Sequence, residues 1–464
     1  SILDYSHDFS SYRPGYLENK IVTMLNSNIF SNRKILVIGM GKTGRSISNA
    51  LIKSKANVFV WDDNKTIRKN LKNKGYNIFN SKNLKKINFI VPSPGITLKG
   101  RDKHKLIKKT INQNIKIVSE LDLFQIYLNN CRNNKNIKVI AVTGTNGKST
   151  IVSQIYHCLK RNNYNAYLIG NIGYPIFDSV KIRNGFYIIE VSSYQLESSK
   201  IFSPDISCIT NITPDHLKRH KSFNNYAKAK LQILNNFSNE KSFFYDQNMI
   251  IKKLIKKRLS KKLYESIKKN NKKNLNEIEI KKILLKDSIT YNQNQLYTYA
   301  ICRTCGVAKN TILSSLKSYK PLPYRQQVIY NDAHRQIIND SKSTNFDSLN
   351  YALSQYKNII LICGGEIKSN KINILDKNSK NVLAAIIIGK EGKLFENYFK
   401  DKCNTIYAVS LKKSFEIALE ISLDSNEYQA ILFSPGAASF DQYKNFEERG
   451  KHFTSIVKTT YFNE

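Results

Sequence analysis

Residues 139–150 restrict the fold of this chain more than any other segment. An apolar run at 139–142 predicts a buried strand, and the sequence Gly-Thr-Asn-Gly-Lys-Ser-Thr follows at 144–150, with a helical pattern directly after it. A buried strand, a glycine turn, Gly-Lys-Ser and a helix form the layout in which backbone N–H groups surround phosphate groups. The segment therefore predicts an α/β fold that binds a nucleotide through its phosphates.

The polar side chains of this loop indicate its chemistry. The ammonium of Lys148 would neutralise phosphoryl oxygens, and the hydroxyl of Ser149 or Thr150 would meet Mg²⁺. The standard loop of nucleoside triphosphatases has a glycine five residues before Gly147, and this chain has Val142 there. The loop is therefore a tighter variant of the standard one.

Three blocks of sequence are separated by turn-rich seams at residues 129–138 and 319–324. In each block, apolar strand-like runs alternate with longer helical patterns, which is typical of α/β domains with parallel sheets. We therefore predict three α/β domains. They are an N-terminal Rossmann-like domain at 1–130, a central phosphate-loop domain with a parallel sheet at 131–321, and a C-terminal Rossmann-like domain at 322–464.

The first block contains the pattern of a dinucleotide site. A strand-like run at 34–38 leads into Gly-x-Gly-x-x-Gly at 39–44, and Asp62 ends the next strand. The missing glycine side chains let a phosphate approach a helix N-terminus, and the carboxylate would meet a ribose or a base edge. The pattern specifies only a ligand of nucleotide-diphosphate size, so an NAD-dependent oxidoreductase remains an alternative.

Carboxylate and imidazole groups follow two strands of the second block. Glu190 ends one strand-like run, and Asp215 and His216 follow the next. Open α/β sheets bind ligands at the carboxyl ends of their strands, so these groups suit a divalent-metal site between a nucleotide and a second substrate. A zinc pair of His216 and His220 is an alternative that the nearby carboxylates disfavour.

The net charge indicates a different possible function, the binding of nucleic acid. The chain of 464 residues has 74 Lys and Arg against 35 Asp and Glu, a formal net charge of +39, which favours binding to nucleic-acid phosphates. Lysine is spread over the whole chain beside abundant Asn and Ile, however, as compositional drift would give. The densest run, at 252–273, has eleven basic residues and apolar residues at helical spacing. It predicts a solvated amphipathic helix, with a polyanion or membrane-surface patch as the alternative.

Composition also limits the compartment. Hydrophobic residues make up 41% of the chain, which is enough for buried cores. No stretch approaches 18 uncharged apolar residues, and the N-terminus lacks the pattern of a signal peptide, so we expect no membrane span and a cytoplasmic location. The seven cysteines are scattered and odd in number, which favours a reducing compartment over a disulfide framework.

The tight loop at 144–150 resembles the ATP loop of the Mur ligase and folylpolyglutamate synthetase superfamily. Further segments extend the resemblance, and they read Tyr-Ala-Lys-Ala-Lys-Leu at 226–231, Leu-Pro-Tyr-Arg at 322–325, Ile-Asn-Asp-Ser-Lys-Ser-Thr-Asn at 338–345, Cys-Gly-Gly-Glu-Ile-Lys at 363–368 and Ser-Pro-Gly-Ala-Ala-Ser-Phe-Asp-Gln-Tyr-Lys-Asn-Phe-Glu-Glu-Arg-Gly at 434–450. Together they look like the D-glutamate-adding members of the Mur ligase family, from about residue 35 to residue 450.

The resemblance implies an ATP-dependent amide ligase that adds D-glutamate to UDP-N-acetylmuramoyl-L-alanine through an acyl phosphate, a step of peptidoglycan precursor synthesis. It implies ATP, Mg²⁺ at two sites, and CO₂ bound as a carbamate on Lys230, with Lys228 the less favoured position. A monomer that needs no nucleic acid is expected. A superfamily ligase that adds a different amino acid is a further alternative beside the NAD-dependent oxidoreductase and the nucleic-acid binder, and the sequence does not distinguish D- from L-glutamate.

The resemblance also assigns individual residues to roles. Catalytic and metal-binding roles fall on Lys148, Ser149, Thr150, Glu190, His216 and Lys230. ATP-binding roles fall on Gly144, Thr145, Asn146, Gly147, Lys148, Ser149, Thr150, Asn292, Arg325, Asp340 and Lys342. Substrate-binding roles fall on Lys42, Thr43, Asp62, Asp63, Gly95, Asn171, Ser192, Gln195, Thr344, Lys368, Ser439 and Phe446. The adenine contact departs from the family pattern His-Asn-x-x-Asn, because Gln295 stands at the second asparagine.

Overall fold

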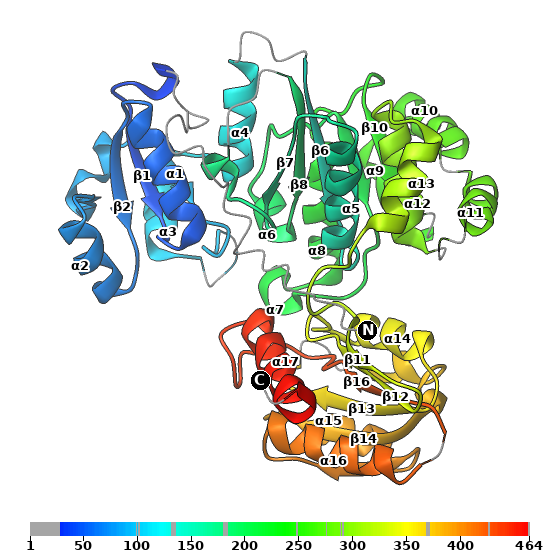
Figure 1. The fold of residues 1–464 in the computed structure, drawn as a ribbon. Coiled ribbons are helices and arrows are strands. Elements are labelled where there is room, and N and C mark those ends of the chain that lie inside the picture. Colours follow the sequence, from blue (N-terminus) through cyan, green and yellow to red (C-terminus); the bar gives the residue numbers. More distant parts are fainter. Residues whose placement is uncertain are drawn as a thin grey trace.

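The computed structural model of the chain contains three β-sheets with helices around them (Figure 1). It describes residues 28–98, 100, 103–130, 136–179, 184–246, 249–274, 276–287, 289, 292–367, 372–425 and 427–462. Lys368, expected to bind substrate, lies outside the described residues. In Figure 1 the blue N-terminal sheet flanks the green middle sheet, and the yellow-to-red C-terminal sheet lies below the middle one.

The first sheet has five parallel strands in the order β3-β2-β1-β4-β5. The strands are β1 (Lys34–Ile38), β2 (Asn57–Trp61), β3 (Asn77–Ile78), β4 (Phe89–Pro92) and β5 (Lys116–Ile117). Its helices are α1 (Lys42–Lys53), α2 (Lys65–Asn73) and α3 (Lys105–Asn112). The strand order reverses between β1 and β4, which is where open α/β sheets bind ligands.

The second sheet also has five parallel strands, in the order β10-β9-β6-β8-β7. The strands are β6 (Ile137–Thr143), β7 (Ala166–Gly170), β8 (Gly185–Glu190), β9 (Ile206–Ile209) and β10 (Ser242–Tyr245). Its helices are α5 (Lys148–Arg161), α6 (Ser193–Glu197), α7 (Leu217–His220), α8 (Phe223–Lys230), α9 (Met249–Arg258), α10 (Lys261–Asn274), α11 (Glu277–Lys286), α12 (Gln293–Thr304) and α13 (Lys309–Ser318). The central strand β6 lies between β8 and β9, so the ends of all three strands meet at one edge.

The third sheet has six strands in the order β11-β12-β16-β13-β14-β15. The strands are β11 (Gln327–Asn331), β12 (Arg335–Asn339), β13 (Ile359–Gly364), β14 (Val382–Ile388), β15 (Asn404–Tyr407) and β16 (Gln429–Phe433). Its helices are α14 (Phe346–Gln355), α15 (Lys393–Phe399), α16 (Leu411–Leu423) and α17 (Phe446–Phe462). Only β11 runs antiparallel to its neighbour among the described strands. The predicted α/β class with three units is confirmed.

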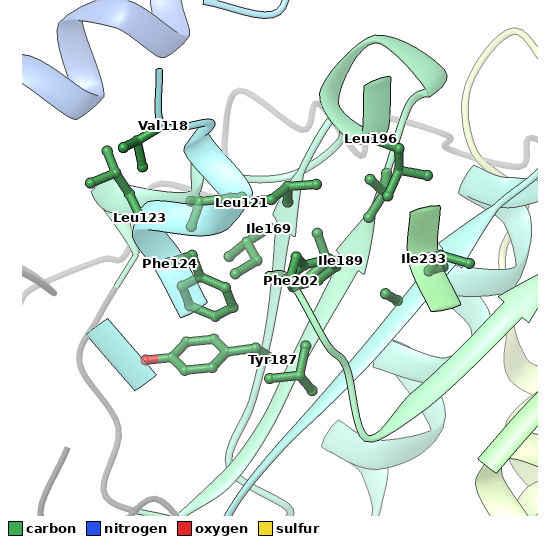
Figure 2. Packing of buried hydrophobic residues seen from close by; sticks show 14 of the residues in the cluster. Val118, Leu121, Leu123, Phe124, Ile169, Tyr187, Ile189, Leu196, Phe202 and Ile233 are labelled. Carbon is green, nitrogen blue, oxygen red and sulfur yellow. The ribbon is translucent and has the colours of Figure 1, made fainter. Parts of the chain in front are cut away.

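Helix α4 (Glu120–Asn129) follows the first sheet in the chain but packs on the second. Phe124 meets Tyr187 of β8 edge to face, with ring centroids 5.4 Å apart (Figure 2). The Asp122 carboxylate accepts hydrogen bonds from the backbone N–H groups of residues 200–202. The domain boundary after residue 130 stays a prediction, and α4 contributes its apolar face to the middle core.

The basic run at 252–273 forms two helices, α9 and α10, where the sequence predicts one. Their apolar stripe is buried through Ile251, Ile255 and Ile267. Most of their lysines therefore face outward, as expected for a solvated amphipathic segment. Within the described parts of the chain, no helix is both long and apolar enough to cross a membrane.

Candidate active site

The phosphate loop joins β6 to α5 through two glycines with positive φ. Gly144 has φ +148° and Gly147 has φ +84°. A Cβ atom at Gly144 would lie 1.8 Å from Oγ1 of Thr210, so only glycine fits beside this residue of the β9 end. The loop is closed by a hydrogen bond of 2.9 Å from the N–H of Asn146 to Oδ1 of Asn211. Helix α5 begins at Lys148 directly after the loop, and a helix N-terminus in this position suits phosphate binding.

Two lysines converge on this loop from different helices. Lys148, the first residue of α5, donates from Nζ to the carbonyl oxygens of Gly144 and Thr145, each at 2.8 Å. Lys230, the last residue of α8, donates to the Gly144 carbonyl at 2.7 Å and is buried. Burial, and then the charge of Lys148, lower the pKa of Lys230 well below 10.5. Asp215 and Glu190 oppose this shift, and burial, the largest cause, moves the balance toward the neutral amine.

Glu190 is buried at the end of β8, beside the loop. Its Oε1 accepts a hydrogen bond of 2.8 Å from Nδ2 of Asn171, and within the described chain its buried Oε2 has no hydrogen-bond partner. Burial alone would raise the pKa of Glu190, but the charges of Lys148 and Lys342 outweigh it and lower the pKa. The carboxylate is therefore ionised and turns one oxygen toward a cationic site.

His216 lies at the start of α7 in a strained backbone conformation, with φ +52°. Its Nδ1 pairs with the hydroxyl of Tyr194 at 3.2 Å, and its Nε2 lies 3.6 Å from Oδ2 of Asp215. His220, the other candidate zinc ligand, uses its Nε2 in a hydrogen bond of 3.0 Å with the hydroxyl of Ser193. The metal-binding role expected of His216 stays a prediction.

The third sheet brings charged groups to the same place. Lys342, after the end of β12, lies with its Nζ 3.8 Å from the ring centroid of Phe446. Burial, and then the charge of Arg325, lower the pKa of Lys342 to about 7, and Glu190 opposes this shift. Burial also lowers the pKa of Arg325, again opposed by Glu190. Arg325 and Lys342 follow Glu190 by more than 130 positions in the chain, and the charges of these three residues nevertheless act on one another.

Asp340 directly follows β12 and holds the loop around Arg325 in place. Its carboxylate accepts from the backbone N–H of Gln326 at 3.1 Å and from the Ser434 hydroxyl at 2.8 Å. Burial raises the pKa of Asp340 to about 7 despite both hydrogen bonds. The side chain thus has structural partners at a position where the resemblance expects an ATP contact.

One direct contact links the third sheet to the phosphate loop. Nδ2 of Asn345 lies 3.5 Å from Oδ1 of Asn146. Thr344, half-buried, precedes this contact, and Ser439 is buried near the start of α17. Of the expected D-glutamate residues that the structure describes, Thr344 and Ser439 thus lie on loops of the third sheet, and Phe446 begins α17 beside Lys342.

In the glycine turn of the first sheet, the backbone of Gly44 lies close to that of Gly39, as the glycine pattern predicts. A Cβ atom at Gly44 would lie 1.9 Å from the carbonyl oxygen of Gly39. Asp62 uses its carboxylate within the turn, since Oδ2 accepts from the Met40 N–H at 2.8 Å. Asp63 instead lines a cavity of about 490 Å³ together with Trp61, Phe79, Asn80, His104, Lys105, Leu106 and Lys109. Lys42 and Thr43 begin α1 beside this turn.

Two residues expected to contact substrate form hydrogen bonds within the protein, at helix α6. Ser192 and Gln195 form a capping box at the start of α6. Nε2 of Gln195 also donates to Oε2 of Glu120 at 3.1 Å. Burial raises the pKa of Glu120 to about 7. No sequence pattern singles out Glu120, because its importance comes from the packing of α4 on the second sheet.

The segment expected to contact adenine begins α12, and its role in binding the base stays a prediction. Asn292 caps α12, and its Oδ1 accepts from the N–H groups of Asn294 and Gln295 at 2.8 and 3.2 Å. Oε1 of Gln295 is buried and lacks a hydrogen-bond partner among the described residues. The departure from the family pattern thus leaves a polar atom at the expected base site.

The residues at the loop fit Mg²⁺ better than a protein-only metal cage. Within the described ranges, no three His, Cys, Asp or Glu side chains gather as a metal-binding group. Mg²⁺ commonly takes one or two carboxylates and completes its shell with phosphate oxygens and water. The unpartnered oxygen of Glu190, beside the phosphate loop, is a ligand of this kind.

The fold and the loop define a three-sheet α/β protein of the nucleotide-binding class. Residues 33–119 match the Mur ligase MurD-like N-terminal domain, and residues 142–301 match the Mur ligase middle domain. The chain belongs to the Mur ligase family, in the branch of the UDP-N-acetylmuramoylalanine--D-glutamate ligases.

Relatives and solved structures agree with this assignment. The UDP-N-acetylmuramoylalanine--D-glutamate ligase of Wolbachia pipientis is 32% identical, over 94% of this chain and 98% of its own length. The enzyme of the same name from Rickettsia felis is 33% identical, over 93% of this chain and 98% of its own length. The MurF ligase of Thermotoga maritima, solved with ADP, has the same fold with a TM-score of 0.53 at 13% identity, covering 94% of this chain and 99% of its own.

Proposed function

We propose that this protein joins D-glutamate to UDP-N-acetylmuramoyl-L-alanine in an ATP-dependent reaction of peptidoglycan precursor synthesis. One observation carries the proposal: Lys148, Lys230 and Glu190 meet at a phosphate loop, and the charges of Arg325 and Lys342 act on the same carboxylate. A ligase must bring a nucleotide and two further anionic reactants together, and this arrangement supplies cations from two sheets. The names of the relatives add the identity of the reactants.

The proposed chemistry has two steps. The alanine carboxylate of the sugar nucleotide attacks the γ-phosphorus of ATP, the bond to ADP breaks, and an acyl phosphate forms. The D-glutamate amine then attacks the acyl carbon, gives up a proton, and inorganic phosphate leaves. Lys148 offsets the charge that develops on the phosphoryl oxygens. When bound, Mg²⁺ neutralises phosphate charge and orients the nucleotide.

The chain's own residues hold the reactants in this scheme. We assign the UDP end to Lys42, Thr43 and Gly95 beside the glycine turn of the first sheet and to the cavity that Asp63 lines. We assign D-glutamate to the third-sheet loops that carry Thr344, Ser439 and Phe446, together with Lys368. Lys342 lies between these loops and Glu190 and would contact an anionic group there.

The second cofactor we propose is CO₂, bound as a carbamate on Lys230. A carbamate forms from a neutral amine, and burial lowers the pKa of this lysine. The product would be an anion beside Glu190 and the phosphate loop, and Mg²⁺ prefers oxygen ligands of this kind.

Because ATP and UDP-sugars are metabolites of the cytoplasm, we propose that the enzyme works there. We also propose that it is a monomer.

Phosphate release with UDP-N-acetylmuramoyl-L-alanine, ATP and Mg²⁺ tests the function, with D-glutamate and L-glutamate in parallel. The proposal expects release that depends on all components and occurs with the D isomer. Release with another amino acid in place of glutamate would indicate a different superfamily ligase. If no amino acid supports release, hydride transfer to NAD would indicate an oxidoreductase, and salt-sensitive binding of nucleic acid would indicate a nucleic-acid-binding protein.

A further inference from the structure

Arg219, on α7 of the second sheet, has its guanidinium against the first sheet. Its side chain is 11% exposed. Nη2 donates to the carbonyl oxygen of Ile96 at 2.7 Å, and Nη1 donates to Oγ1 of Thr97 at 2.8 Å and to the carbonyl of Gly95 at 3.3 Å. One side chain therefore makes three contacts to the loop after β4.

Two residues of α6 also contact the guanidinium of Arg219. Nη2 lies 3.2 Å from Oε2 of Glu197, whose side chain is 10% exposed. The guanidinium carbon lies 5.1 Å from the ring centroid of Tyr194, and the hydroxyl of that tyrosine pairs with His216. The orientation of Arg219 is thus set by Glu197 and Tyr194, and Tyr194 also contacts the candidate metal-binding histidine.

The loop that Arg219 contacts belongs to the ligand crevice of the first sheet. It follows β4, next to the point where the strand order reverses. The hydroxyl of Ser93, at the start of this loop, donates to the carbonyl of Gly39 in the glycine turn. A shift of residues 95–97 would therefore move the crevice relative to the phosphate loop.

We propose that Arg219 is a positioning residue that sets the nucleotide-sugar crevice of the first sheet at a fixed distance from the phosphate loop of the second. This role rests on the proposed function, in which the sugar nucleotide spans the two sheets and must present its carboxylate to ATP. A displacement of about 1 Å at a reacting centre can lower a rate about 100-fold, so a fixed separation has a direct kinetic value. Arginine suits the position because its planar group carries five N–H donors in a fixed fork, whereas lysine has its three donors on a single nitrogen at the end of a flexible stem.

Steady-state kinetics of Arg219→Ala and Arg219→Lys tests the proposal. We expect Arg219→Ala to lower kcat by up to about 100-fold and to raise KM for the sugar nucleotide about tenfold or more, and to leave KM for ATP within about twofold, because the phosphate loop itself is untouched. Arg219→Lys should fall between this variant and the wild type. Arg303→Ala is the matched control, since this exposed arginine also donates to a backbone carbonyl, that of Val307, but lies on α12 away from the crevice.

Hydrogen exchange gives a second readout that does not need turnover. Backbone amides at 93–98 should exchange faster in both Arg219 variants, with those of the phosphate loop unchanged. Equal kcat and equal KM for the sugar nucleotide in Arg219→Ala and wild type would overturn the proposal, as would equal rises in KM for all three substrates, which a general loss of structure would give. If the wild type does not use the sugar nucleotide, the proposed function fails, and exchange at 93–98 still decides the role of Arg219. Unchanged exchange there would overturn it.

Discussion

Asn171 donates a hydrogen bond of 2.8 Å from Nδ2 to Oε1 of Glu190, across the ends of two neighbouring strands. The bond fixes the rotation of the carboxylate and leaves Oε2 as the oxygen without a hydrogen-bond partner in the described structure. Asn171 therefore acts on the candidate metal site through Glu190, in addition to the substrate contact that the resemblance implies. Such partners behind a ligand tune metal affinity.

The Asn171→Ala variant should need more Mg²⁺ for activity. Loss of a hydrogen-bond partner behind a metal ligand typically costs about 10- to 100-fold in metal affinity, so the Mg²⁺ concentration at half-maximal phosphate release should rise by that factor. Asn165→Ala is a control, because this asparagine bonds to the backbone of Asn184 away from the loop. An unchanged Mg²⁺ dependence in Asn171→Ala would show that Glu190 keeps its orientation without the amide.

The carbamate proposal predicts opposite results at two lysines of one helix. Lys230→Ala should lose activity and recover part of it with added short carboxylic acids, which can occupy the space of the carbamate. Lys228→Ala should keep activity within about twofold, since this lysine is exposed and such surface changes are usually nearly neutral. Phosphate release with and without added acetate measures both. Full activity of Lys230→Ala would contradict the carbamate, and so would a Lys230→Ala variant whose lost activity is not recovered by acetate.

Lys148→Ala should lower phosphate release at saturating Mg²⁺ by about 10²- to 10³-fold, because a preorganised donor to the transferring phosphoryl group is removed. Lys138→Ala tests the specificity of this loss. Lys138 lies on the preceding strand, is exposed and pairs with Asp205, so its loss should change the rate little. Near-normal ADP release by Lys148→Ala would exclude the phosphate loop as the ATP site.

Several features of the site follow from sequence alone. The loop at 144–150 combines a strand, two glycines and a lysine, and each residue type has a steric or electrostatic reason that needs no tertiary information. Glu190 and His216 could be placed at strand ends for the same reason. The sequence does not give the order of the strands, and only that order puts β8 and β9 on either side of β6.

Other features depend on packing that local patterns do not encode. An apolar face such as that of α4 can pack on either neighbouring sheet, so its position on the second sheet could not be predicted. Asp62 and Gln195 carry expected substrate roles, and the structure uses both side chains for hydrogen bonds within the chain. Arg219 has no motif around it, because its partners come from a loop more than 120 residues earlier.

Glu120 provides a prediction about stability. Burial raises its pKa from 4.5 to about 7, and nearby Asp178 adds to the shift, whereas the hydrogen bond from Gln195 opposes it. A carboxyl group whose pKa is higher in the folded than in the unfolded state stabilises the fold at low pH and loses that contribution as pH rises. The free energy of unfolding should therefore fall between pH 4.5 and 7, by about 3 kcal/mol at most.

The Glu120→Gln variant should remove this pH dependence and keep the contact to Gln195, because the new amide oxygen can accept the same hydrogen bond. Urea unfolding at pH 5 and pH 8 measures the difference. The variant should be more stable than the wild type at pH 8, by up to about 3 kcal/mol, and nearly equal to it at pH 5. Glu240→Gln, a change at an exposed carboxylate, should give the same difference from wild type at both pH values. A Glu120→Gln variant less stable than wild type at pH 8 would mean that Glu120 is ionised and paired in the folded protein.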